Sequence, residues 1–86
     1  MEKAAVALKT LAKAVNNTNP SALSDLGVAV HCLLAGINGA WLNVLINLGG
    51  IKDEAFVAEY KQKGKRLLDE SSALAARLQK DIEAQL

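Results

Sequence analysis

A long central segment of this chain carries no charged side chain. Residues 26–51 contain no Asp, Glu, Lys or Arg, whereas charged residues are frequent on both sides of the segment. An apolar run of this length is long enough to cross a bilayer, which takes about 20 residues, and it equally suits a helix that other helices bury on most sides. The segment therefore predicts one long helix that needs a covering environment.

Polar side chains inside this segment favour the buried helix over the membrane span. The segment has no aromatic belt, and its flanks show no clear basic bias. Four polar residues interrupt it: His31, Asn38, Asn43 and Asn47. Polar groups are costly in lipid, and membrane helices normally carry aromatic and basic residues at their ends. We predict a buried central helix and no membrane insertion, with a single-span membrane protein as the less favoured alternative.

Composition makes helices the expected secondary structure. The chain has 86 residues, 51% of them hydrophobic, yet only Trp41, Phe56 and Tyr60 are aromatic, so Leu, Ile, Val and Ala must form the core. These side chains favour packed helices. The predicted fold class is all-α, with antiparallel helices around the long central one. A chain this short buries only roughly 60 to 65% of its unfolded surface, so its own core is small.

Turn and capping residues divide the chain into three predicted helices at about residues 3–15, 21–48 and 53–84, in a single domain or fragment covering residues 1–86. Asparagines before Pro20 end the first helix, Gly49 and Gly50 end the second, and Asp53 starts the third. The third helix would be about 50 Å long, which exceeds a compact domain of this size. Part of it is expected to pack on a second chain, and Gly64 and the Ser71-Ser72 pair are weak helix positions where it is expected to bend or break.

One face of the central helix carries small and polar side chains. At about 100° per residue, five of them fall within a stripe roughly 60° wide: Asp25, Cys32, Gly36, Asn43 and Asn47. Glycines let another backbone approach closely, and the two asparagines lie one turn apart, so Gly36, Gly39, Asn43 and Asn47 are predicted at a helix interface. Two alternatives stay open: tight packing with satisfied amides, or a polar seam that lines a pocket once other helices supply the opposite wall.

Charge and cysteine content exclude several functional classes. Ten basic residues against nine acidic ones leave a net charge of +1, which lacks the excess needed to bind a phosphate backbone, so no nucleic-acid partner is expected. Cys32 and His31 are single, so no metal site is expected. Lys9 and Lys13 interrupt the apolar residues near the start, so no secretory signal is expected either. A cytoplasmic location follows.

General catalytic motifs are lacking, but three spaced segments within residues 19–56 resemble a known family. The chain has no nucleophile elbow, Walker loop, metal-binding histidine pair or dinucleotide fingerprint. The three segments follow the patterns N-x4-SD, GA-x2-NV-x-INL and I-x-DEAF, which begin at Asn19, Gly39 and Ile51. Together they resemble the cyclodeaminase/cyclohydrolase family of folate enzymes, and the series is far more specific than any single short motif.

The resemblance implies a soluble helical homodimer with a folate substrate, no metal and no prosthetic group. Such enzymes are lyases that convert 5-formimidoyltetrahydrofolate to 5,10-methenyltetrahydrofolate and ammonia, or hydrolases that interconvert methenyl- and formyltetrahydrofolate. The chain matches the C-terminal part of this larger dimeric fold. The family's Pro-Gly-Gly-Gly-Ser segment does not occur, and Thr18 stands where the family usually has Gly. The chain is therefore expected to be inactive alone and to act with a second copy or a complementing N-terminal part.

The resemblance also places a candidate site near the start of the central helix. Cyclodeamination needs a base as the folate nitrogen attacks the formimino carbon, and an acid to protonate the departing ammonia. Asp25 is the best local candidate for either role, with a carboxylate at the helix start that binds backbone amides as the alternative. Asn19 and Ser24 are expected to orient the substrate, or to serve as loop and cap residues.

Two further interpretations stay open. The basic residues of the third helix are either solvated or form an anion site, for example for a polyglutamate tail: Lys61, Lys63, Lys65 and Arg66. The rival function for the whole chain is a non-catalytic helical assembly module, in which the same helix faces only bind a partner chain.

Overall fold

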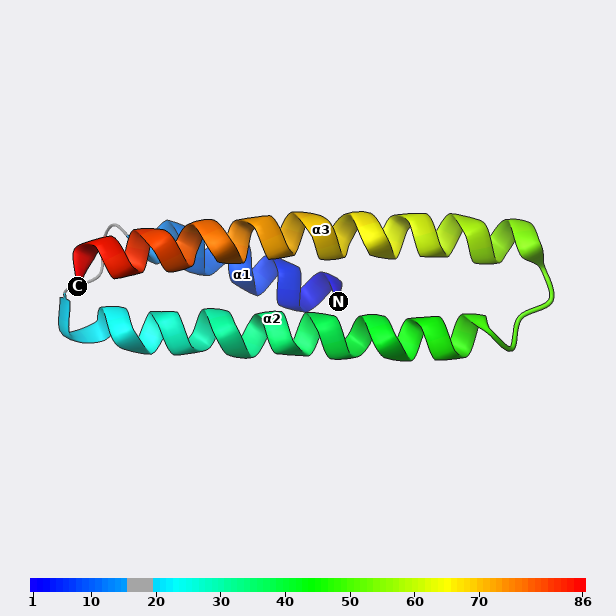
Figure 1. Cartoon of the computed structure of the whole chain (residues 1–86), viewed down its shortest axis with the longest axis horizontal. Helices are drawn as coiled ribbons and strands as arrows, with labels where there is room; N and C mark the ends of the chain where they lie inside the picture. The colour runs from blue at the N-terminus through cyan, green and yellow to red at the C-terminus, as the bar shows by residue number, and fades with distance from the viewer. Residues whose placement is uncertain (16–19) are drawn as a thin grey trace.

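The computed structural model describes residues 1–15 and 20–86 as three helices (Figure 1). They are α1 (Glu2–Ala14), α2 (Pro20–Leu48) and α3 (Glu54–Gln85). The described residues contain no strand, so the predicted all-α class is confirmed. The helix ends differ by at most one residue from those expected from the sequence.

The turn between α2 and α3 satisfies the backbone groups at both helix ends. Gly49 N–H donates to the Leu45 carbonyl at 3.1 Å, and Gly50 N–H donates to the Asn47 carbonyl at 3.2 Å. At the start of α3, Asp53 Oδ1 accepts a hydrogen bond of 3.1 Å from Phe56 N–H. A capping aspartate satisfies one of the amides that a helix start leaves unpaired. The glycine pair and the acidic cap therefore end and start the helices as the sequence indicated.

The three helices form an elongated bundle measuring 51 × 17 × 15 Å. Figure 1 shows α2 and α3 as a long antiparallel hairpin, with α1 beside the half that holds the start of α2 and the end of α3. Only this half has three helices, and the main hydrophobic core lies here. Its buried residues are Leu8 and Val15 of α1, Leu23 and Val30 of α2, and Ala75, Leu78 and Ile82 of α3.

The spacing of buried residues explains why the hairpin forms. In α2, Leu23, Val30 and Ile37 recur at every seventh residue and are at most 1% exposed. In α3 the buried positions alternate steps of three and four: Leu68, Ser71, Ala75, Leu78 and Ile82. Both patterns put the buried residues on one side of a helix, which is the arrangement that left-handed helix pairs need.

Trp41 of α2 packs directly against Gly64 of α3 in the half of the hairpin beyond α1. A Cβ at Gly64 would overlap Cζ3 and Cε3 of the Trp41 ring, so the absence of a side chain makes room for the indole. The expected break at Gly64 or at Ser71-Ser72 does not occur, because α3 is continuous from Glu54 to Gln85. The glycine is a place of close approach, which explains its occurrence inside a helix.

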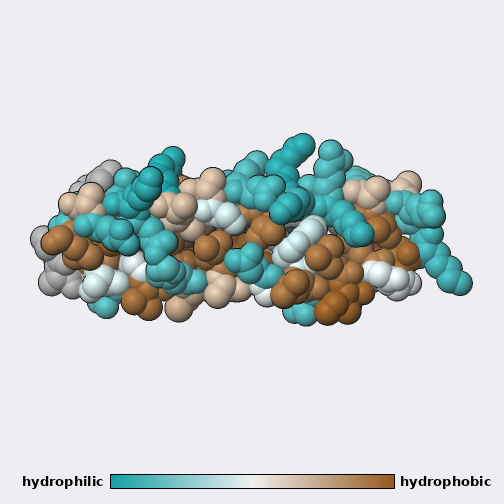
Figure 2. Space-filling model, in the orientation of Figure 1, coloured by the Kyte–Doolittle hydropathy of each residue, from teal (hydrophilic) through white to brown (hydrophobic). Residues whose placement is uncertain are grey.

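The central helix is buried on one side only, which corrects the prediction that other helices surround it. Within Ala22–Leu48, only 11% of the most apolar 18-residue stretch is made of buried residues. Val28, Leu42 and Ile46 are 62%, 60% and 74% exposed. The physical reason is that α1 and α3 both pack on the same side of α2 and leave its other side uncovered. In Figure 2, hydrophobic surface gathers along the α2 edge, whereas hydrophilic side chains dominate the α3 edge.

By length and composition alone, Ala22–Leu48 could cross a membrane, since its mean hydropathy is 1.6. In this fold, however, α3 packs along α2 and carries exposed charged residues from Glu54 to Glu83. Inserting the hairpin would take these side chains into lipid at about 2.5 to 3.5 kcal/mol for each one near the bilayer centre. The packing of α3 along α2 therefore opposes insertion of the hairpin as a whole.

Gly64→Ala is expected to lower the free energy of unfolding by about 1 to 3 kcal/mol, because the added methyl group forces the Trp41 ring to move. Urea denaturation followed by circular dichroism measures this. Gly27→Ala is the matched control, since its Cβ would lie 3.8 Å from Ile82 Cγ2, an ordinary contact. The control should keep or slightly raise stability, as Ala normally does in a helix. Equal effects of both changes would contradict the close packing at Gly64.

Candidate functional site

Ser24 and Asp25 lie side by side in the second turn of α2, and both are exposed. The first turn of α2 contains no acidic residue, so Asp25 is not the helix-start carboxylate that the alternative interpretation required. By that point the backbone amides bond within the helix. Asn19, the third residue predicted here, lies outside the described residues. Asp25 thus remains available to a group that approaches from outside the chain.

The four predicted interface residues lie on the uncovered side of α2. Gly36, Gly39, Asn43 and Asn47 are all exposed. No atom of another helix lies within 4 Å of a Cβ built on either glycine. Within residues 1–15 and 20–86, the expected close helix crossing therefore does not occur. Contact of these residues with a second chain stays a prediction.

The predicted site residues are spread along α2 and do not meet. Asp25 and Asn43 are separated by about 27 Å along the helix, at about 1.5 Å per residue. One small reaction centre cannot use both from a single chain. The sequence-derived residues thus mark two places on α2, one near its start and one near its end.

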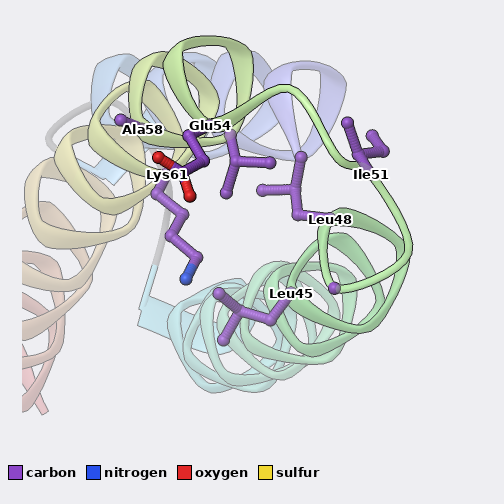
Figure 3. Close-up of a pocket in the computed structure, with 8 residues that line it drawn as sticks. Leu45, Leu48, Ile51, Glu54, Ala58 and Lys61 are labelled. Atoms are coloured by element: carbon purple, nitrogen blue, oxygen red, sulfur yellow. The ribbon is translucent and has the colours of Figure 1, made fainter.

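An apolar groove of about 320 Å³ opens between the end of α2 and the start of α3 (Figure 3). Its walls are formed by Leu45, Leu48, Gly49, Ile51, Glu54, Val57, Ala58 and Lys61. The sequence did not reveal this groove, because its two walls meet only when the hairpin folds. A signal was present, since Leu45 and Leu48 belong to the second quoted motif, and Ile51 and Glu54 belong to the third.

The groove combines an apolar wall with two opposite charges. Figure 3 shows the Lys61 side chain reaching from α3 toward Leu45, with the Glu54 carboxylate beside the stem of Lys61. Clefts that bind small molecules are mostly apolar with a few polar groups that fix orientation. This arrangement suits a ligand with a flat apolar part and charged or polar ends.

The basic residues of α3 do not form one anion site. Lys63 Nζ lies 3.2 Å from Glu59 Oε1, and Lys65 Nζ lies 3.2 Å from Asp69 Oδ1. Lys63 also stands 5.5 Å above the centre of the Tyr60 ring. These exposed pairs contribute little stability, but they orient Lys63 and Lys65 toward carboxylates of the same helix. Of the basic cluster, Lys61 lines the groove.

Titratable residues elsewhere in the described part of the chain offer no metal centre. No group of three or more His, Cys, Asp or Glu residues there is placed to hold an ion. His31 Nε2 instead forms a hydrogen bond with Gln79 Nε2 across α2 and α3, on the exposed surface. The groove and the exposed carboxylate of Asp25 remain as candidate groups for binding and catalysis in the described part of the chain.

Comparisons with family profiles and with curated proteins point to the same family. The sequence profile of the formiminotransferase-cyclodeaminase family matches residues 1–66. Formimidoyltransferase-cyclodeaminase of Sus scrofa is 42% identical over 66 residues, which cover 77% of this chain and 12% of that protein. The enzyme of the same name from Gallus gallus is 40% identical over 89 residues, with 87% of this chain and 16% of that protein covered.

A shorter relative also matches. Methenyltetrahydrofolate cyclohydrolase of Methylorubrum extorquens is 37% identical over 68 residues, covering 79% of this chain and 33% of that protein. The chain thus spans a third or less of the length of these relatives, and no solved structure matches it. Because the family profile covers more than half of the sequence, including the three motif segments up to residue 56, this chain belongs to the formiminotransferase-cyclodeaminase family.

Proposed function

We propose that this chain is part of a folate-processing enzyme that carries out cyclodeamination or the related cyclohydrolase reaction. The family match over residues 1–66 carries the proposal. Its relatives are named for chemistry on formimidoyl and methenyltetrahydrofolate groups. The substrate of this chain would then be a tetrahydrofolate derivative that carries a one-carbon group on nitrogen, and its location would be the cytoplasm.

The single chain supplies separate parts of a reaction centre. Asp25 is exposed near one end of α2, and the groove lies near the other end. Proton transfer requires the acid or base within hydrogen-bond reach of the reacting atom, which neither part alone provides. Additional helices from a second copy or from a complementing N-terminal part would bring a carboxylate and a groove together.

In this proposal the groove binds one end of the folate. Leu45, Leu48 and Val57 would contact an aromatic ring of the substrate, and Lys61 would pair with a carboxylate of its glutamate tail. Asp25 would move the proton, as base toward the attacking nitrogen or as acid toward departing ammonia.

A second candidate function is a helical assembly module without catalysis. The observation that favours it is the exposed side of α2, where Val28, Leu42 and Ile46 stand uncovered. An assembly module would bind a partner chain on this side and would show no affinity for folate. Calorimetric titration with 5-formyltetrahydrofolate, of the protein alone and of the protein complemented with the N-terminal part, separates the two functions. Heat of binding at micromolar ligand in either preparation supports the enzyme, and its absence in both supports the module.

Asp25→Asn is expected to lower turnover by about 100-fold or more in a preparation that releases ammonia from 5-formimidoyltetrahydrofolate, alone or complemented with the N-terminal part. The change keeps the side-chain size and removes the titrating group. Because Asp25 is exposed, the free energy of unfolding should change by less than about 1 kcal/mol. Asp81→Asn, at an exposed position of α3, is the control. Near-normal ammonia release by the Asp25 variant at saturating substrate would remove Asp25 from catalysis.

Lys61→Gln is expected to weaken binding of a folate polyglutamate by about three- to tenfold, because it removes the cation from the groove. The matched control is Lys65→Gln, which removes an equal charge on the same helix but breaks only the pair with Asp69. Titration at fixed ionic strength compares the two variants. Equal loss of affinity in both would mean that general charge, and not the groove, attracts the ligand.

A further inference from the structure

A second hollow lies where the start of α1 meets the hairpin. Figure 1 shows the N-terminus beside the middle of the hairpin, and all three helices supply residues to this hollow. Its volume is about 170 Å³. We call it the three-helix hollow, and its lining residues are Met1, Glu2, Val44, Tyr60, Lys63, Gly64 and Leu67. None of them lines the groove at the turn, so the two spaces are separate.

The hollow and the groove open on different flanks of α3. At about 100° per residue, the α3 residues of the hollow are centred about 120° around the helix from the α3 residues of the groove. Met1 and Glu2 line the hollow and not the groove, so α1 contributes to the first space only. A ligand in the hollow is therefore independent of a ligand in the groove.

One wall of the hollow is a glycine in contact with a tryptophan. The Trp41 ring lies against Gly64, where it occupies the space that a Cβ would take. Trp41 is thus a direct neighbour of a residue that lines the hollow. It is also the only tryptophan of the chain, so its fluorescence reports on this place alone.

The size and walls of the hollow suit one aromatic ring. An apolar cavity of about 150 Å³ is large enough to bind benzene, and the hollow has a similar volume. Val44 and Leu67 supply aliphatic wall, and Tyr60 supplies an aromatic ring that is 44% exposed. Phe56 packs against Tyr60 with the ring centres 4.4 Å apart. A ligand ring in the hollow extends this aromatic pair, which favours binding beyond the burial of apolar surface.

Two charges of opposite sign line the hollow. Lys63 carries an ammonium group and Glu2 a carboxylate, and both residues are exposed. Lys63 is paired with Glu59 at 3.2 Å, but an exposed pair of this kind contributes little stability. Lys63 can therefore exchange Glu59 for the carboxylate of a ligand at small cost. Within residues 1–15 and 20–86, Glu2 takes part in no ion pair, so its carboxylate is available to an amine.

A ring that carries both a carboxylate and an amine uses all of these groups. We propose that the three-helix hollow binds a small zwitterionic compound with one aromatic ring, of the class of the aromatic amino acids. The ring packs among Val44, Tyr60 and Leu67, the carboxylate pairs with Lys63, and the amine pairs with Glu2. This site uses neither Asp25 nor the groove, so it stands or falls independently of the proposed function.

Trp41 fluorescence tests the proposal with four probes. L-Phenylalanine carries the ring, the carboxylate and the amine, whereas 3-phenylpropionate lacks the amine, phenethylamine lacks the carboxylate and L-alanine lacks the ring. L-Phenylalanine is expected to change the fluorescence saturably, with a Kd of about 1 mM or below. Loss of one charge should weaken binding about two- to fivefold, and loss of the ring at least about tenfold.

Three results with these probes would overturn the proposal. They are no saturation by L-phenylalanine up to about 10 mM, binding of L-alanine as tight as that of L-phenylalanine, and equal affinities of the three probes that contain a ring.

Charge variants assign each end of the ligand. Lys63→Gln should abolish the preference for L-phenylalanine over phenethylamine, whereas Lys65→Gln, which breaks only the pair with Asp69, should keep it. Glu2→Gln should abolish the preference for L-phenylalanine over 3-phenylpropionate. Unchanged preferences in the Lys63 and Glu2 variants would overturn the assignment of the ligand to this hollow.

A filling variant tests the place of the ring. Leu67→Phe adds volume to the wall and should abolish the response to L-phenylalanine. Ile46→Phe, at a position of α2 that is 74% exposed and outside the hollow, is the matched control and should keep the response. Circular dichroism checks that both variants keep their helix content. If Leu67→Phe loses helix content, the Lys63 and Glu2 variants, which change exposed side chains, still decide the proposal. A full response in folded Leu67→Phe would contradict it.

Discussion

The contact of α2 with α3 along one side determines everything else about this molecule. Leu23, Val30 and Ile37 recur every seven residues on α2 and are almost completely buried. Each such side chain contributes about 1.5 to 3 kcal/mol relative to exposure, so the hairpin is fixed on this side. Once this contact forms, the opposite side of α2 must face outward, because the described residues form only α1 as a further helix and α1 packs on the same side. The groove between the two helices is a second consequence of the same contact.

Local chemistry made the helices predictable, whereas their burial depends on how many helices are available. Proline, glycine and aspartate at the helix ends restrict the backbone within a few residues, so the observed bounds follow from short segments of sequence. Burial of α2 is different. An uncharged helix has the same composition whether it is surrounded, membrane-embedded or half exposed, and only the charged α3 along its length distinguishes these arrangements. Gly64 shows the same limit of local prediction. Nothing near it in the sequence indicates that Trp41, more than twenty positions earlier, fills the space that a side chain at Gly64 would take.

The candidate site was predictable in its motifs and not in its geometry. The segments that resemble the family contain Asp25 near the start of α2 and Leu45, Leu48, Ile51 and Glu54 around the turn. The helix period alone showed that Asp25 and Asn43 are too far apart for one reaction centre. The groove required two further facts, namely that α2 and α3 are antiparallel and that Lys61 reaches the same space as Glu54. Such relations between distant residues appear only when the hairpin is folded.

The two sides of α2 have different consequences for function. The inner side uses residues spaced by seven to hold α3, whereas Val28, Leu42 and Ile46 on the outer side stay exposed in the described part of the chain. A helix with two such sides can pack against α3 of its own hairpin on one side and leave the other side free for a further helix. Because the motif residues of this family lie at both ends of α2, about 27 Å or more apart along the helix, the fold of this chain does not bring Asp25 and the groove together.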